Sequence, residues 1–230
     1  ECGNPTCMAF AMKVAQGALT IDKCPHMSPE ALATLSEATA PPMKTIKVGE
    51  HQLGGETVLY RHEKTFVSKT LYSVRVCDGM EESEQQELLA AIPKIDYERI
   101  GERMYVEFVT VSHSAEKSVG DYAALVSKAK ELGRDLILDC TDVEAAKAGL
   151  EAASGSNVIL NGANESNYSE MSALAVSAGC VLGVRSADIS ALHDTVAALE
   201  ASGNKNLVLD VTGEDIKSTF ANAVMVRRAA

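Results

Sequence analysis

The chain has 230 residues, a formal net charge of -11 and no tryptophan, with 46% hydrophobic and 4% aromatic residues. This length allows one large domain, or one medium-sized domain with a small additional unit. The acidic balance argues against nucleic-acid binding, which requires a basic surface, and no apolar run of about 18 residues is present that could span a membrane.

Residues 1–43 are predicted to form a small helical module. Residues 6–18 and 28–39 read as two helices, in which the hydroxyls of Thr6 and Ser28 cap the first backbone N–H groups. An Ala-Pro-Pro stretch then ends the module, because proline cannot continue a helix. So short a unit buries little apolar surface and needs a staple, for which a metal site is one solution.

Residues 44–70 are predicted to be a linker hairpin. The stretch KTIKV at residues 44–48 alternates between polar and apolar side chains, and Gly54-Gly55 is a turn signal.

From residue 71 to residue 230 the pattern becomes six repeated βα units, typical of a parallel sheet. The predicted strands are residues 71–78, 104–113, 135–140, 157–162, 180–186 and 206–211. The predicted helices are residues 83–92, 119–132, 142–153, 167–178, 188–201 and a last helix from about residue 214.

The fold class is therefore α/β. No GxGxxG motif follows any strand, which removes the main support for a dinucleotide-binding open sheet. Since a complete (β/α)₈ barrel takes about 250 residues, six units predict an incomplete TIM-type barrel. A flavodoxin-like open sheet is the structural alternative.

Three of the six cysteines are scattered along the chain. Cys77, Cys140 and Cys180 each lie in or beside an apolar run and are interpreted as small core residues. A disulfide-stapled secreted domain is short and dense in cysteine, unlike this chain. We therefore expect a reducing, cytoplasmic environment.

The other three cysteines, Cys2, Cys7 and Cys24, cluster near the start with C-x4-C-x16-C spacing. An iron–sulfur cluster suits such loops, in which small residues let backbone N–H groups approach the sulfurs and Pro25 follows the last cysteine. A zinc site with His26 as the fourth ligand is a second interpretation. Three unrelated thiols are the third.

Polar residues end several predicted strands. They are Asp78, His113, Asn161 and Asp210, with Asp139 one residue before its strand ends. In a barrel these ends form the face on which active sites are built, and carboxylates there could act as acids or bases. Alternatively, Asp and Asn at these positions cap the helices that follow.

The stretch ECGNPTCMAFAMKVAQGALTIDKCPHMS, continued by ATAPPMKTIKVG, resembles the start of the large (gamma) subunit family of corrinoid/iron–sulfur proteins. These belong to the carbon monoxide dehydrogenase/acetyl-CoA synthase system of anaerobic acetogens and methanogens. The family pattern is CG-x-CG-x-PTC-x-AFA, followed after sixteen residues by CP. The run GGETVLYRHEKTF is also similar. The resemblance covers the whole chain, most specifically residues 1–66.

The resemblance implies a module that holds one [4Fe–4S] cluster on four cysteines. Three of them match Cys2, Cys7 and Cys24, and the first would lie upstream of Glu1, so we expect a chain trimmed at its start. The family continues into a TIM-type barrel and then a corrinoid (cobamide) domain, which we expect to lie beyond this chain. No D-x-H-x-x-G cobalt-ligand motif occurs in the sequence.

The implied function is that of a methyl carrier in the reductive acetyl-CoA pathway, without catalytic residues in this chain. The implied partners are the small (delta) subunit, a methyl-tetrahydropterin methyltransferase and acetyl-CoA synthase. One alternative is a barrel methyltransferase that acts directly on a methyl-pterin through Asp78, Asn161 and Asp210. Another is a zinc-stapled interaction module. Whether the chain is itself an enzyme stays open.

Overall fold

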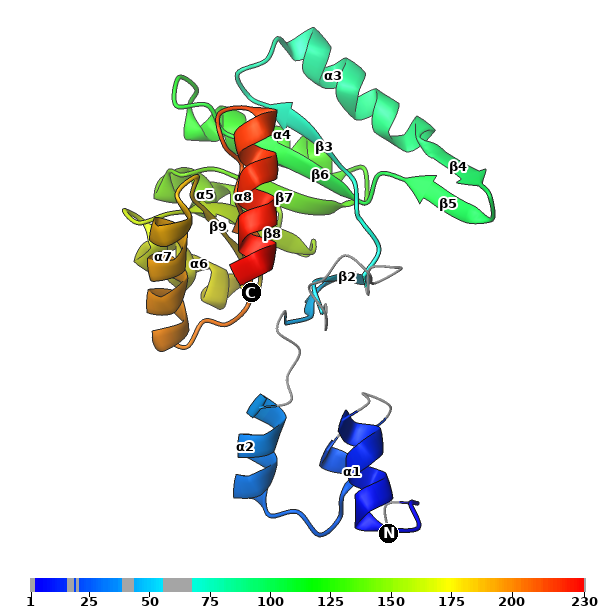
Figure 1. Cartoon of the computed structure of the whole chain (residues 1–230). Helices are drawn as coiled ribbons and strands as arrows, with labels where there is room; N and C mark the ends of the chain where they lie inside the picture. The colour runs from blue at the N-terminus through cyan, green and yellow to red at the C-terminus, as the bar shows by residue number, and fades with distance from the viewer. Residues whose placement is uncertain (1–2, 16–18, 20, 39–43, 56–67, 230) are drawn as a thin grey trace.

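A computed structural model describes residues 3–15, 19, 21–38, 44–55 and 68–229. Its first part is a pair of helices that lies apart from the sheet (Figure 1). The elements of this module are α1 (Cys7–Ala15), the short 3₁₀ helix η1 (Ile21–Lys23) and α2 (Pro29–Ala38). Thr6 Oγ1 accepts from the Ala9 N–H at 3.1 Å and Ser28 Oγ from the Ala31 N–H at 3.2 Å, which confirms both predicted caps.

A six-stranded parallel sheet forms the rest of the molecule, in the order β10-β9-β8-β7-β6-β3. Its strands are β3 (Ser73–Cys77), β6 (Phe108–Ser112), β7 (Asp135–Asp139), β8 (Val158–Ala163), β9 (Val181–Arg185) and β10 (Leu207–Asp210). The helices that follow them are α3 (Glu82–Ala91), α4 (Val119–Lys130), α5 (Val143–Ala152), α6 (Tyr168–Ala178), α7 (Ile189–Ala201) and α8 (Ile216–Ala229).

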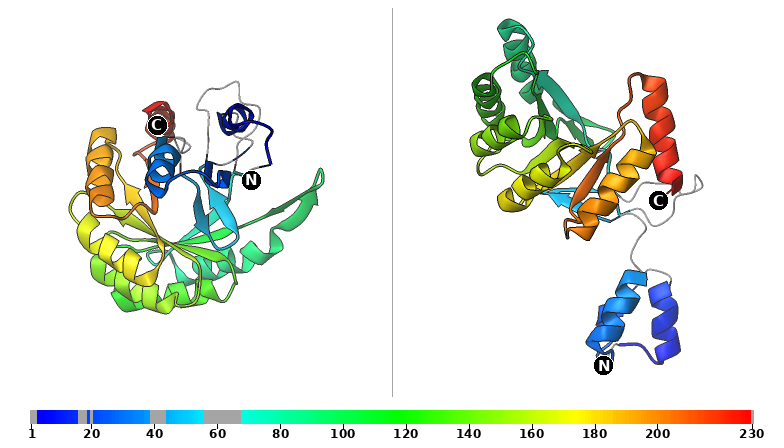
Figure 2. Two further views of the ribbon diagram at one scale, coloured as in Figure 1. Left: turned by 90° about the horizontal axis from the view of Figure 1, so that it is seen from below. Right: turned by 90° about the vertical axis from the view of Figure 1, so that its left-hand side faces the viewer.

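Each strand of this sheet pairs with the next strand of the parallel series. An open flavodoxin-like sheet reverses its strand order partway, so this unbroken order excludes that alternative. Seen from below, the helices form an outer arc around the curved sheet (Figure 2). The predicted TIM-type fold is thus confirmed, with β3 and β10 at the two edges of the sheet.

The two faces of the sheet have different contents. The outer face, with Val109, Leu138 and Leu160, packs against the helices in the main hydrophobic core. A smaller core lies inside the curve at the amino ends of the strands, where Ile46 and Val48 pack on Phe108, Ile159 and Val181. The hairpin of β1 (Ile46–Val48) and β2 (His51–Leu53) therefore closes the amino end of the barrel.

The chain enters the barrel at this closed end. Lys44, two residues before β1, donates from Nζ to the carbonyl of Lys205 at 3.0 Å. The β1–β2 turn lies at Gly49 and Glu50, not at the predicted Gly54-Gly55. Residues 56–67, which include most of the GGETVLYRHEKTF run, lie outside the described residues.

One predicted strand was wrong. Residues 104–113 were expected to be continuous, but β5 (Glu102–Tyr105) and β6 are separate strands. The N–H groups of Glu107 and Phe108 both bond to the Tyr72 carbonyl, so the regular ladder begins only at β6. β5 pairs instead with β4 (Asp96–Arg99), which follows the 3₁₀ helix η2 (Ile92–Lys94) and was not predicted.

Two glycines allow the inside of the barrel to close at its carboxyl end. Gly162 has φ +117° at a bulge in β8, and a Cβ there would lie 2.1 Å from the Cys140 carbonyl oxygen. Gly183 faces Asn161, and a Cβ there would lie 2.3 Å from Asn161 Oδ1. The missing side chain at Gly183 is therefore the space that the Asn161 amide occupies.

We predict that Gly183→Ala destabilises the protein by about 1–3 kcal/mol, because a new methyl group must push Asn161 and its backbone aside. Urea unfolding followed by circular dichroism measures this loss. Gly120→Ala is the matched control, since Gly120 lies exposed in α4 and a Cβ there would make only an ordinary contact with Ser118 Oγ, at 3.6 Å. There alanine should leave stability unchanged or raise it by about 0.5 kcal/mol. Equal effects at both positions would contradict the packing argument.

Candidate functional site

Four polar side chains meet inside the barrel at the carboxyl ends of consecutive strands. Arg185 Nη2 lies 2.6 Å from Asp139 Oδ1 and 2.7 Å from Asp210 Oδ2. Asn161 Nδ2 donates to the same Asp210 oxygen at 2.8 Å and approaches Asp139 Oδ1 at 3.4 Å. One guanidinium and one amide thus join two carboxylates contributed by β7 and β10.

This cluster continues to the other edge of the sheet. Ser112 Oγ donates to Asp139 Oδ2 at 2.8 Å and accepts from Arg75 Nε at 2.7 Å. Arg75 also lies 3.9 Å from Asp139. Because Arg75 belongs to β3 and Asp210 to β10, the chain of contacts crosses the barrel from one edge strand to the other.

The charges in this cluster balance. Burial of the Asp210 carboxyl opposes its ionisation, but hydrogen bonds from Asn161 and Thr212 and the charge of Arg185 outweigh burial and lower its pKa to about 2. Burial also works against the charged form of Arg185, yet the two carboxylates raise its pKa above the ordinary value. Both groups are held ionised and paired, and a carboxylate with so low a pKa is only a weak base near neutral pH.

We predict that Asp210→Asn costs about 2 kcal/mol of stability at neutral pH. A carboxyl whose pKa falls from its ordinary 3.8 to about 2 on folding stabilises the fold above about pH 4. That stabilisation is lost as the pH falls toward 2, so the variant should show a weaker loss of stability between these pH values. Thermal unfolding at a series of pH values measures this, with Asp194→Asn, which is exposed on α7, as the control. An unchanged acid profile in Asp210→Asn would contradict the assignment.

Asp78 and His113 make a separate pair. His113 Nδ1 lies 2.6 Å from Asp78 Oδ2, and the Ser114 N–H donates to Asp78 Oδ1 at 2.7 Å. The His113 ring packs at 5.0 Å from the Tyr122 ring of α4. Both side chains are buried in the layer between sheet and helices. Asp78 was predicted to share a binding face with Asn161 and Asp210, but its contacts hold it in this outer layer instead.

The helix-cap interpretation of the strand ends was also wrong. The caps are Ser118 for α4, Asp142 for α5 and Asp188 for α7. The strand-end residues Asp139 and Asp210 make their contacts inside the barrel.

Arg75, Ser112 and Arg185 were not among the predicted site residues. A period-two reading places Arg185 on the same face of β9 as Gly183, but only the register between β9 and β10 sets it beside Asp210.

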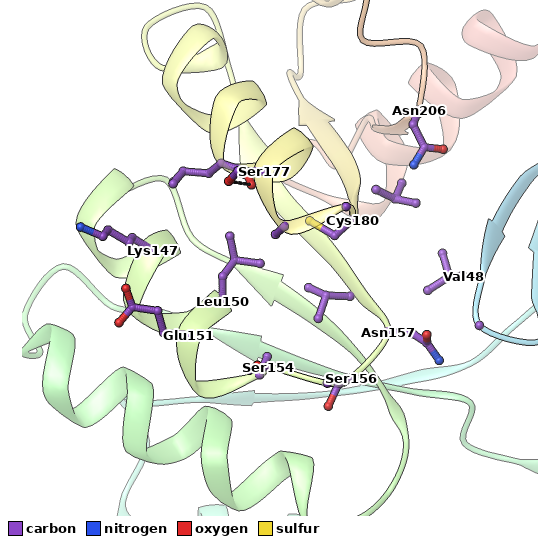
Figure 3. Close-up of a pocket in the computed structure, with 18 of the residues that line it drawn as sticks. Val48, Lys147, Leu150, Glu151, Ser154, Ser156, Asn157, Ser177, Cys180 and Asn206 are labelled. Carbon is purple, nitrogen blue, oxygen red and sulfur yellow. Dashed lines mark hydrogen bonds between the residues drawn. The ribbon is translucent and has the colours of Figure 1, made fainter.

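A cavity of about 650 Å³ lies at the opposite, amino end of the barrel. Figure 3 shows Lys147 and Glu151 of α5 on one side of it, Val48 of β1 on the other and Cys180 between them. Burial raises the pKa of the Cys180 thiol, which is therefore protonated at neutral pH. The amino end of such barrels serves stability rather than catalysis, and we assign no site there.

The scattered cysteines have the expected surroundings. Cys140 is buried and Cys77 and Cys180 are half-buried, all without disulfides. Burial raises the pKa of Cys140 to about 12. The thiols of Cys140 and Cys180 are therefore protonated packing groups and poor ligands for a metal.

Cys7 is different, because it is exposed and is the first residue of α1. An exposed thiol at this position is accessible to a metal ion or cluster. Cys24 is half-buried directly after η1, in the same module, and Cys2 lies outside the described residues. Among the residues that the structure describes, no group of three or more His, Cys, Asp or Glu side chains is placed to hold a metal ion, and these residues include only two of the three candidate thiols.

Across the described ranges, no helix has the length and apolar character needed to cross a bilayer.

Comparisons with known proteins agree with both parts of the chain. Residues 46–230 match a family model described as the CO dehydrogenase/acetyl-CoA synthase delta subunit, and residues 1–26 match a family model for an Fe-S cluster. The corrinoid/iron-sulfur protein large subunit of Moorella thermoacetica is 32% identical over 234 residues, which cover 100% of this chain and 52% of that protein.

A second relative is the acetyl-CoA decarbonylase/synthase complex subunit gamma of Methanothermobacter thermautotrophicus, 33% identical over 241 residues with the same coverage. The chain thus spans about half the length of these relatives. Among solved structures, dihydropteroate synthase from Thermus thermophilus matches with a TM-score of 0.51 and 16% identity, over 81% of this chain and 72% of that one. This likeness supports the TIM-barrel fold alone.

Proposed function

Because the chain belongs to the CO dehydrogenase/acetyl-CoA synthase delta subunit family, we propose that it is the iron–sulfur and barrel part of a methyl-carrier subunit of the reductive acetyl-CoA pathway. The observation that carries this proposal is the pairing of an iron–sulfur match and a barrel match in one chain, all of which aligns with gamma-type relatives.

In this proposal Cys2, Cys7 and Cys24 ligate a [4Fe–4S] cluster, with a fourth cysteine supplied upstream of Glu1 in the natural protein. The exposed thiol of Cys7 at the start of α1 supports this assignment. Pro25 directly follows Cys24, and a proline commonly follows one cysteine ligand of an iron–sulfur cluster.

The group bound on these thiolates would supply one low-potential electron, which returns corrinoid cobalt from Co(II) to the methyl-accepting Co(I) state. The corrinoid itself belongs, in this proposal, to a part of the natural protein outside residues 1–230. The work of this chain's residues is to hold the cluster near the surface of a small module, so that it can approach the corrinoid.

The barrel is proposed to be a scaffold and docking surface. Its balanced interior supports this, since Arg185 already occupies the space between the Asp139 and Asp210 carboxylates. The proposed partners are the delta subunit, a methyl-tetrahydropterin methyltransferase and acetyl-CoA synthase, all placed in the cytoplasm.

The barrel methyltransferase is the second candidate. It is favoured by the presence of Asn161, Asp139 and Asp210 at the carboxyl end of a barrel shared with dihydropteroate synthase. Calorimetry with a methyl-tetrahydropterin separates the two proposals. We expect no binding at millimolar ligand, because the polar groups of this end are already paired with one another. Binding in the micromolar range that Asn161→Ala abolishes would establish the methyltransferase instead.

We predict that Cys7→Ala or Cys24→Ala in the natural full-length protein removes the visible absorption of the cluster and abolishes reductive reactivation of cobalt. Far-UV circular dichroism should be preserved, because the barrel has its own core. Cys180→Ala is the matched control and should retain colour and iron content. Stoichiometric zinc in a colourless wild-type protein would end this proposal and favour the zinc-stapled module.

A further inference from the structure

Helix α1 of the helical module is apolar on both of its sides. Its sequence, CMAFAMKVA, contains one charged residue, Lys13. Phe10 is buried and Val14 is half-buried, so these two residues mark the inner side of the helix. A helix at a protein surface ordinarily presents polar residues to water on its other side. The apolar outer side of α1 therefore needs an explanation.

The outer side forms one continuous apolar surface, which we call the α1 face. It consists of Met8, Ala11, Met12 and Ala15, which have the i, i+3, i+4, i+7 spacing of one side of a helix. Met8 is 71% and Met12 59% exposed, and both alanines are exposed as well. Single exposed apolar side chains are common on proteins, whereas contiguous ones mark a contact surface.

The two methionines suit a contact that forms and breaks. A thioether side chain is unbranched and polarizable, so it fits surfaces of irregular shape, and methionine is frequent where a surface adapts to its partner. The α1 face thus matches a module that approaches its partner and leaves it again, as the proposed function requires.

The α1 face begins next to Cys7. Ala11 lies about one turn along the helix from Cys7, and Ala15 about two turns. With a rise of about 1.5 Å per residue, the whole face extends about 12 Å from Cys7 along the helix axis. A partner seated on this face is therefore held beside the group that the Cys7 thiol is proposed to carry.

The lack of charge on the α1 face indicates which kind of partner it takes. Lys13 lies about 150° around the helix from the middle of the face. Redox partners that meet by diffusion are steered by complementary charge, and this face offers none. A partner on the same polypeptide needs no steering, because the tether keeps its effective concentration high.

We propose that the α1 face is the docking surface for the corrinoid-holding part of the natural polypeptide, with Met8 and Met12 as its principal contacts. This chain spans 52% of the length of its gamma-type relatives, so these relatives carry a further half on the same polypeptide. The inference rests on the proposed function, which places the corrinoid outside residues 1–230.

The test uses the natural full-length protein with Met8→Gln and Met12→Gln combined. Glutamine resembles methionine in length and helix propensity, but its amide opposes burial in a contact. In a single turnover, dithionite supplies one electron to the module, and the same electron converts Co(II) to Co(I). The rate of Co(I) formation should fall about tenfold or more, because the docked state is weakened.

Hydrogen exchange followed by mass spectrometry gives a readout that does not depend on electron transfer. The amides of α1 should exchange about threefold faster or more in the double variant than in the wild type, because docking no longer protects them. The visible absorption and the iron content should stay unchanged. If the double variant loses iron, Met12→Gln alone, more than one turn from Cys7, provides both measurements.

Lys13→Gln is the matched control, since it places the same side chain on the same helix outside the α1 face. It should match the wild type in both measurements.

The outcomes are distinct. Wild-type rates of Co(I) formation and of α1 exchange in the methionine variants would overturn the inference and leave the proposed function intact. Slower reduction of the module by a protein electron donor, with unchanged transfer to cobalt, would assign the face to that donor and overturn the proposal. A wild-type protein that holds no iron or reduces no cobalt would remove the proposed function itself.

Discussion

Paired charge inside the barrel is the constraint on which the rest of the structure depends. Buried ions are tolerated only when each one is paired and hydrogen-bonded, and here Arg185 meets that condition for Asp139 and Asp210 together. The geometry requires four strands in fixed register, and Ser112 and Arg75 extend it to the first strand. The curvature of the sheet therefore depends on these interior charge pairs, and the charge pairs form only when the strands are held in this register.

The pairing of these charges also bears on function. A barrel whose carboxyl end is filled by its own guanidinium and amide groups has little unpaired chemistry to offer a substrate. A family that keeps the fold shared with dihydropteroate synthase can thus use the barrel as a support, as we propose for this chain. In that proposal the reactive group is carried by the small separate module, in which Cys7 is exposed and Cys24 half-buried.

Most of the fold could be predicted from the sequence because its signals are local. Alternation of β-branched strands with amphipathic helices located every βα unit, and the hydroxyls of Thr6 and Ser28 marked two helix starts. The β4–β5 hairpin was missed because its turn is Ile100-Gly101, and a branched residue is not expected at positive φ. The unfavourable backbone conformation of Ile100 thus explains why no turn was predicted at this position.

The interior site was only half predictable. Asp139, Asn161 and Asp210 were found because they lie at or near the ends of apolar strands, but their partners Arg75, in the middle of β3, and Arg185, the last residue of β9, were missed. Charges at such positions are paired by register across the sheet, which is not a local property. The outer position of Asp78 likewise follows from its contact with His113, 35 residues away in the sequence. The cluster ligands depended on family resemblance, since three thiols in a short module also fit zinc.

The helical module and the polar cluster of the barrel lie toward opposite ends of the strands, because of where the chain enters the barrel. Lys44 ties the start of β1 to the carbonyl of Lys205, and β1 closes the amino end of the strands. The chain therefore enters the barrel at its amino end, away from the carboxyl ends of the strands where Arg185 and Asp210 lie. In the function we propose, electron delivery from the module and an encounter at the carboxyl end of the barrel would use different surfaces.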